Sequence, residues 1–224
     1  MRKIPLVNGC YYHIVTRSIA KYEIFNNGDD YLRIMALLDL YRFLDFQYKY
    51  SKFIGHSLRH QKAIVNSMKN SAQLVEIVAY CIMPTHIHLI LKQKTDNGIS
   101  KYMARVLDAY TRYFNVKYHR TGPLWEGRFK SVLVDTDEQL LHLTRYLHLN
   151  PTSAGLVKKP QDWQFSSYRE YVRSRKNKSF SHLCQFEEVI DVDPKEYRNF
   201  VHDRINYQKE ISKIKKLLIE NYTG

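Results

Sequence analysis

Four short segments of the chain are rich in β-branched and aromatic residues, which is typical of strands. Two of these segments are separated only by Pro84 and Thr85, and this spacing predicts a hairpin. In the second strand of that hairpin, His86 and His88 share one face, and Ile87, Leu89 and Leu91 point to the other. The four predicted strands cover residues 10–17, 74–83, 86–92 and 129–134.

Three longer segments place apolar residues at the three- and four-residue spacing of an amphipathic helix. The first covers 30–46 and follows a turn at 26–29, and the second covers 99–118. The third covers about 137–149, with Asp135 or Thr136 as its N-cap and Pro151 as its stop. The apolar stripe of the second helix consists of Ile99, Tyr102, Met103, Val106, Leu107, Tyr110, Tyr113 and Phe114.

The predicted elements follow the order β-α-β-β-α-β-α. Four strands with two crossing helices in this order predict an α+β fold, a ferredoxin-like antiparallel sheet with one added C-terminal helix. We therefore expect one domain over residues 1–172. Within it, the basic stretch 48–73 is an insertion, either helical or an ordered loop.

The pattern weakens after residue 151, and 160–171 is expected to be irregular. Residues 173–178 form a basic linker, and 196–222 is a lysine-rich segment with helical spacing. We assign 173–224 to a basic helical extension. It is either a helix docked on the domain or an additional DNA clamp.

Charge narrows the range of partners. The chain of 224 residues has 35 Lys and Arg against 22 Asp and Glu, a formal net charge of +13. Such a field favours a polyanion, and the 13% of aromatic residues offer stacking platforms for bases. Nucleic acid is therefore the expected partner. Charge alone leaves DNA, RNA, an acidic protein partner or mere solubility open.

Targeting signals and cysteine pairs are not evident. No run of about 18 apolar residues occurs, and the first residues lack the apolar core of a signal peptide. We expect a cytoplasmic, nucleoid-associated protein that does not contact a membrane. Cys10, Cys81 and Cys184 have neither disulfide nor metal spacing, so we interpret them as reduced thiols.

His86 and His88 are the sharpest chemical feature. Residues i and i+2 of a strand point to the same face, so the two imidazoles project together, away from Ile87. Two adjacent imidazoles form half of a metal site. The alternative is a pair of surface histidines on an amphipathic strand.

Tyr146 and Asn150 are a second candidate pair. They are four residues apart on the third predicted helix, so they share one face. A phenolate can attack a phosphodiester, and an amide oxygen can complete the ligand set of a metal. The chain contains 18 tyrosines, however, and most must have packing or surface roles.

Four stretches carry a family resemblance when they are taken in order. AYCIMPTHIHLILK resembles the histidine–hydrophobic–histidine motif of IS200-type single-tyrosine transposases. The resemblance continues through YTRYFNVKYHRTGPLWEGRFKSVLV, LLHLTRYLHLNPTSAGLV and DWQFSSYREY. Together they resemble the REP-associated tyrosine transposase branch over residues 4–171. The insertion at 48–73 and the chain beyond Arg173 lie outside the pattern.

The resemblance implies a role for each matching residue. Tyr146 corresponds to the nucleophile, and His86, His88 and Asn150 correspond to the ligands of Mg²⁺ or Mn²⁺. It also implies a 5′-phosphotyrosine intermediate, a catalytic role for the added helix, and hairpin-forming single-stranded DNA as substrate. Both monomers and dimers occur in the family, so a homodimer remains open. Tyr110 and Tyr113 are rival nucleophiles, but their apolar stripe indicates a core role.

Basic residues around the second helix and the turn after it are the candidate phosphate contacts. Any one of them can equally be part of a solvated charged surface. Trp125 could stack on a base, although packing is the favoured role. The candidates are Arg105, Arg112, Lys117, Arg120, Arg128 and Lys130.

The sequence leaves three rival functions to weigh. A domesticated relative could bind DNA hairpins without cutting them, and an RNA-binding protein would also fit the charge. A structural zinc protein would need four tetrahedral ligands, which scattered cysteines and two clustered histidines do not supply. The strongest expectation is thus a metal-dependent endonuclease and strand transferase acting on single-stranded DNA.

Overall fold

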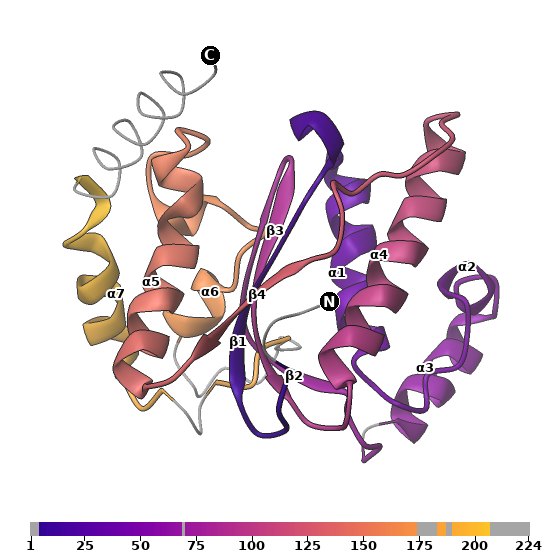
Figure 1. Ribbon diagram of the computed structural model, residues 1–224, viewed down its shortest axis with the longest axis horizontal. Coiled ribbons are helices and arrows are strands. Elements are labelled where there is room, and N and C mark those ends of the chain that lie inside the picture. Colours follow the sequence, from indigo (N-terminus) through magenta and orange to yellow (C-terminus); the bar gives the residue numbers. More distant parts are fainter. Residues whose placement is uncertain (1–4, 69, 174–182, 187–189, 207–224) are drawn as a thin grey trace.

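The computed structural model describes residues 5–68, 70–173, 183–186 and 190–206. Its centre is a four-stranded sheet with the order β2-β3-β1-β4 (Figure 1). The strands are β1 Tyr11–Arg17, β2 Val75–Met83, β3 His86–Gln93 and β4 Lys130–Val134. All three neighbouring pairs are antiparallel, which confirms the predicted ferredoxin-like sheet.

The two faces of the sheet are covered by different helices (Figure 1). Helices α1 Gly28–Tyr41 and α4 Gly98–Lys117 pack together against one face, and α5 Asp137–Ser153 lies over the other. The start of α4 approaches the sheet so closely that a Cβ on Gly98 would collide with the carbonyl of Leu74. This position therefore requires glycine. The predicted α4 stripe is buried, with Leu107 and Tyr113 at its partly exposed margin.

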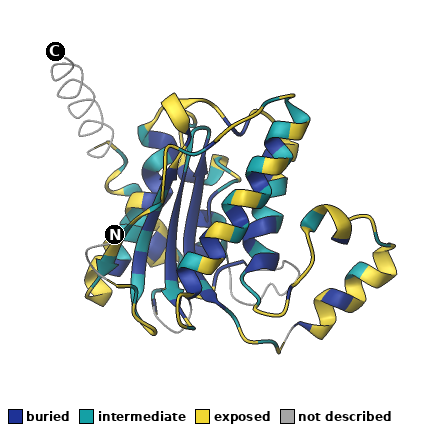
Figure 2. Ribbon diagram, turned by 45° about the vertical axis from the view of Figure 1, so that its right-hand side comes forward, coloured by how far each residue is buried: buried dark blue, intermediate teal, exposed yellow. Residues whose placement is uncertain are grey.

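The basic insertion is helical. It contains α2 Tyr50–Phe53 and α3 Leu58–Ser67, which form an arm beside α4 (Figure 1). Most of its surface is exposed, as the yellow segments of Figure 2 show. Phe53 is 5% exposed and packs against Phe46, and this contact anchors the arm to the domain.

Two predicted helix ends are wrong, for different reasons. Helix α1 ends at Tyr41 rather than at residue 46, because the next residues pair with the segment that precedes β2. The backbone N–H of Leu44 bonds to Ala72, and that of Leu74 bonds to Arg42. Tertiary pairing thus overrides the helical pattern.

Pro151 does not stop helix α5, which continues to Ser153. The chain leaves the helix at Gly155, whose φ of +77° is a conformation that favours glycine and commonly ends helices. Thr136 is the N-cap, since its side chain accepts a hydrogen bond from the Gln139 N–H. Asp135 is not the capping residue.

The segment predicted to be irregular covers the outer edge of β2. It contains a 3-10 turn, η2 Pro160–Asp162, and the short helix α6 Tyr168–Tyr171. Between them the chain pairs with the strand, through the Ile82 N–H to Phe165 and the Ser167 N–H to Tyr80. A second 3-10 turn, η1 Ile19–Lys21, follows β1.

Helix α7 Pro194–His202 packs against the outer side of α5. The buried Tyr197 hydroxyl lies 2.7 Å from Nδ1 of His148 and donates to Oγ1 of Thr144 at 2.8 Å. Nε2 of His148 is 2.8 Å from Oγ of Ser167, so a buried polar network holds α5 in place. The rest of the predicted helix, 207–222, lies outside the described residues.

None of the helices in the described ranges combines the length and the apolar character needed to cross a bilayer.

Candidate active site

Four aromatic side chains meet between the sheet and α5. The imidazole of His88 stacks on that of His13, with ring centroids 5.3 Å apart and Nδ1 of His88 3.0 Å from Nε2 of His13. His86 meets His88 edge-on at 5.0 Å. The ring of Tyr146 stands edge-on to both His88, at 5.9 Å, and His13, at 6.3 Å. The predicted histidine pair and the predicted nucleophile therefore share one site.

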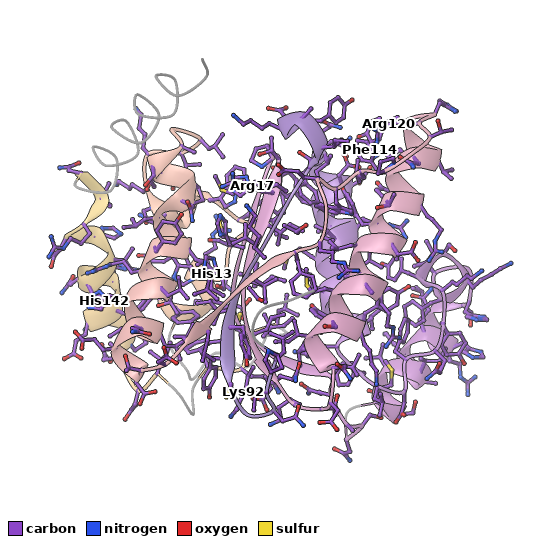
Figure 3. The ribbon with its side chains drawn as sticks, viewed as in Figure 1. His13, Arg17, Lys92, Phe114, Arg120 and His142 are labelled. Atoms are coloured by element: carbon purple, nitrogen blue, oxygen red, sulfur yellow. The ribbon has the colours of Figure 1, made fainter. Side chains whose placement is uncertain are left out.

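His13 is the member of this cluster that the sequence analysis missed. It lies on β1 with its neighbour Val15 opposite His88 on β3. In Figure 3 His13 lies between the sheet and α5, and Arg17 lies farther along the same strand. The two-residue period of the strand YYHIVTR places His13, Val15 and Arg17 on one face, and this was the available signal, but only the pairing of β1 with β3 places His13 beside His88.

Burial keeps the histidines neutral. Desolvation lowers the pKa of His13 to about 4. Desolvation, aided by the positive charge of Arg17, lowers the pKa of His86 to about 4. The pKa of His88, which is 4% exposed, falls well below 6.5 because of desolvation and its neighbours His86, His13 and Arg17. Neutral imidazoles retain the lone pair that a metal ion or a proton would use.

A cleft of about 510 Å³ opens beside the rings. Its floor is the α5-facing side of β1 and β4, including Val15 and the exposed Val132. Arg17, Arg128 and Lys130 line it, with Glu126 as the acidic member. Tyr146, 38% exposed, forms part of the wall. Cations and an accessible phenol beside a solvent-open cleft suit a phosphodiester.

The rival tyrosines lie elsewhere. Tyr110 is fully buried on the other side of the sheet, and its hydroxyl donates to the Ile24 carbonyl. Tyr113 donates to the buried carboxylate of Asp30 at 2.9 Å. Burial raises the pKa of both phenols. Tyr110 has the core role that the apolar stripe indicated, whereas Tyr113 lies at the partly exposed margin of the stripe and is bound to Asp30.

Comparison with known proteins shows which transposases this chain resembles. Residues 41–150 match the family model described as transposase IS200-like. A candidate REP-associated tyrosine transposase of Haemophilus influenzae is 33% identical over 110 residues, 44% of this chain and 62% of the relative. Over this segment the chain is therefore similar to IS200-like transposases.

Two further proteins resemble this chain. The REP-associated tyrosine transposase of Escherichia coli is 26% identical over 98 residues, 43% of this chain and 56% of that protein. The two alignments thus span less than two thirds of either relative. A solved REP-associated tyrosine transposase bound to a REP hairpin has a TM-score of 0.53 at 16% identity, over 81% of this chain and 94% of its own. That likeness supports the fold.

The segment that matches the IS200-like family model contains His86, His88, Tyr146 and Asn150, whereas His13 precedes it. Asn150 lies one helical turn beyond Tyr146, and its side-chain nitrogen is buried without a hydrogen-bond partner among the described residues. The described ring contacts of the cluster do not include Asn150. Its place in a ligand set stays a prediction.

The six predicted phosphate contacts separate into three groups. Arg128 and Lys130 line the cleft. Lys117 binds Asp30 at 2.7 Å, and Arg120 bonds to Asn115 and to the Pro123 carbonyl at 3.3 Å, so both also stabilise the turn region around α4. The remaining pair, Arg105 and Arg112, lies on another surface of α4.

Trp125 packs, as expected. Its indole N–H donates to the Leu107 carbonyl at 3.2 Å and lies 3.0 Å from Oγ1 of Thr111.

The part of the chain that the structure describes contains no group of three or more His, Cys, Asp or Glu arranged to hold a metal ion. To bind a metal ion, the two predicted histidines would need a further ligand of another kind, such as the predicted amide. The neutral histidines fit this requirement, since Nδ1 of His86 contacts Oγ1 of Thr85 at 2.9 Å and Nδ1 of His88 contacts His13. The Nε2 atom of each ring is left as the candidate ligand atom.

Proposed function

We propose that this protein is a transposase that cuts and rejoins single-stranded DNA at hairpin-forming sequences. The observation that carries the proposal is the partly exposed Tyr146, set edge-on against His13 and His88 in a cation-lined cleft. The IS200-like family match supports the reaction class. The solved relative with a REP hairpin makes a folded single strand the substrate to test first.

His86, His88 and Asn150 would hold Mg²⁺ or Mn²⁺ in this proposal. Imidazole nitrogen favours Mn²⁺ by ligand type, while an amide oxygen accepts either ion. The bound ion would supply Lewis-acid stabilisation of charge on the scissile phosphate. The buried amide of Asn150 without a partner and the neutral imidazoles suit that role.

His13 orients His88 in this arrangement. When Nδ1–H of His88 donates to Nε2 of His13, the lone pair of His88 is confined to its Nε2 atom. The stacked rings also fix the plane of His88. His13 is therefore a positioning residue for the histidine pair.

Tyr146 acts as the nucleophile. Its phenolic oxygen attacks phosphorus, and the bond from phosphorus to the 3′ oxygen of the preceding nucleotide breaks. A 5′-phosphotyrosine and a free 3′-hydroxyl result. Water takes the phenol proton, and the departing 3′ oxygen gains one, so the step is balanced. Attack of a 3′-hydroxyl on the phosphotyrosine reverses the step and rejoins a strand.

Cations in the cleft hold the DNA for this attack. Arg17 on β1, Arg128 in the loop before β4 and Lys130 on β4 line the same cleft as Tyr146. Phosphate contacts of this kind fix the position of a strand without reading its sequence. The half of the sheet formed by β1 and β4 leaves room for the DNA strand to lie across it.

Mapping of the covalent adduct tests the proposal. The protein is incubated with Mn²⁺ and a library of single-stranded hairpins, digested, and sequenced by mass spectrometry. We expect the nucleotide on Tyr146. An adduct on Tyr110 or Tyr113 would overturn the mechanism, and tight hairpin binding without any adduct would make the protein a hairpin-binding module.

A further inference from the structure

A second hollow lies on the opposite side of the sheet from the cleft. It has a volume of about 410 Å³ and lies between α4 and the chain that leads from α1 into the insertion. Because α4 and α5 cover opposite faces of the sheet, this hollow is separate from Tyr146 (Figure 1).

One face of α4 gives this hollow a row of charges. Lys101, Arg105, Asp108 and Arg112 occur at positions i, i+4, i+7 and i+11 and all line it. At a rise of about 1.5 Å per residue the row is roughly 16 Å long, enough for several successive phosphates. Lys49 lies on the opposite rim, so four cations face one carboxylate.

These cations differ in how they are held. The Arg105 guanidinium donates to the carbonyls of Phe43 and Phe46, and Arg112 pairs with Asp108 at 2.6 Å. Arg105 therefore also stabilises the rim. Lys49 and Lys101 are exposed, and within the described ranges neither has an ion pair. These two lysines are the cations available to a ligand without structural cost.

An exposed aromatic ring completes the hollow. Tyr48 is 41% exposed and is held by ring contacts with Phe46, 5.8 Å away, and with His56, 6.0 Å away. His56 in turn stacks on His60 at 4.6 Å. A fixed, exposed aromatic ring beside a row of cations is the combination that binds single strands, because stacking requires unpaired bases.

We propose that this hollow binds a second stretch of single-stranded DNA, with phosphates on Lys49, Lys101 and Arg112 and a base stacked on Tyr48. The choice of DNA as the polyanion rests on the proposed function; the choice of a single strand rests on the stacking platform. The occupant would be a single-stranded flank of the DNA whose hairpin lies at the cleft. The arm 48–73 would thereby extend the DNA footprint.

Equilibrium binding tests the proposal independently of cleavage. The full-length double variant Lys49→Ala/Lys101→Ala is compared with Lys158→Ala/Lys195→Ala, which removes the same charge from exposed lysines outside both hollows. Fluorescence anisotropy is measured on a hairpin with long single-stranded flanks and on the same hairpin without flanks. Thermal melting of both variants confirms that they are folded.

We expect the first variant to bind the flanked hairpin roughly tenfold more weakly at low salt and the bare hairpin as tightly as the parent does. The slope of log affinity against log salt should fall by about 1.4 for the flanked DNA, at 0.7 per lost contact. Cleavage at saturating DNA should be unchanged. Equal losses in the two double variants, or equal losses on the two DNAs, would overturn the proposal.

Tyr48→Ala separates stacking from charge. Stacking is worth about 1–3 kcal/mol per base, so the affinity for flanked DNA should fall roughly 5- to 150-fold, while Tyr48→Phe should retain it. Tighter binding of an RNA flank than of the matched DNA flank would assign the hollow to RNA and overturn the DNA proposal. Failure of the proposed transposase activity would show instead as an absent tyrosine adduct with these binding differences intact.

Discussion

The two faces of the sheet show how one strand serves both a core and a site. Toward α1 and α4, β1 presents the fully buried Ile14, and β3 presents Leu89, also fully buried. Toward α5, β1 presents the half-buried His13, and β4 presents Val132 at 64% exposure. Helix α5 packs mainly on β2, so the half of this face over β1 and β4 stays open. The sealed face supplies stability, and the half-covered face leaves room for a ligand.

Removal of a single tyrosine hydroxyl on each face gives the largest expected difference, in cleavage on one face and in stability on the other. Tyr146→Phe should lower cleavage by roughly 10³-fold or more, because it removes the nucleophile, and should change the free energy of unfolding by only about 0.5 kcal/mol, because the ring is 38% exposed. Tyr110→Phe should leave cleavage unchanged. It should instead cost about 1–3 kcal/mol of stability, because the Ile24 carbonyl loses its buried donor.

Cleavage assays and urea unfolding of both variants measure this contrast. Full cleavage by Tyr146→Phe would remove the distinction between the two faces.

His13 provides the next largest effect. His13→Ala should weaken Mn²⁺ binding roughly 10- to 100-fold, because the Nδ1 partner of His88 is lost. Isothermal titration calorimetry measures this, with His60→Ala on the exposed arm as the control. Hairpin affinity without metal should not change.

Undiminished Mn²⁺ affinity in His13→Ala would contradict the positioning role. Complete loss of binding in both His13→Ala and His13→Gln would make His13 a direct ligand instead.

The pH dependence of stability tests the contribution of buried His148 to the packing of α5. Desolvation lowers the pKa of His148 from 6.5 to about 3, so between these values the unfolded chain binds the proton and the folded chain does not. Stability should be full above pH 6.5 and should fall as the pH drops toward 3. The slope from this histidine is on the order of 1.4 kcal/mol per pH unit. Urea unfolding from pH 7 to pH 5 measures it.

His148→Gln keeps a polar partner for Tyr197 but no longer titrates, so its stability should depend less steeply on pH. An identical pH dependence in the parent and the variant would show that other groups dominate the acid response.

Removal of a single cation from the cleft should have the smallest effect, on the salt dependence of hairpin binding. Arg128→Ala should reduce the salt dependence of hairpin binding by about 0.7 to 0.9 in slope, the loss of one phosphate contact. Lys117→Ala is the matched control, since its amino group pairs with the buried Asp30 and its loss should lower stability instead. Anisotropy titrations at several salt concentrations distinguish the two. A larger slope change in Lys117→Ala would place DNA at the end of α4.

The order of strands and helices could be predicted from local sequence patterns, because the alternation of a strand and the apolar stripe of a helix depend only on neighbouring residues. They also placed His86 and His88 on one face of β3. They could not reveal His13, whose partnership depends on β1 pairing with β3 across 75 residues. The end of α1 was wrong for the same reason, since a contact with a segment about thirty residues later cuts this helix short.

The phosphate contacts show another limit of sequence reasoning. Arg105 and Arg128 are equally basic in the sequence, yet one lies at the insertion and the other at the cleft. Which side of a sheet a helix covers is a tertiary property. The cations near α4 could therefore be listed from the sequence, but their division between two surfaces could not be predicted.

The uneven protection of the two sheet edges has a consequence for self-association. The outer edge of β2 is sealed by residues 163–167, whereas β4 has one strand partner in the described part of the chain. An open edge can template the strand of another copy and start aggregation. Strand β4 is only five residues long and begins with Lys130, which limits both the length and the attraction of such a ladder. The edge of β4 can therefore remain open beside the cleft while offering little surface for strand pairing between two copies of the protein.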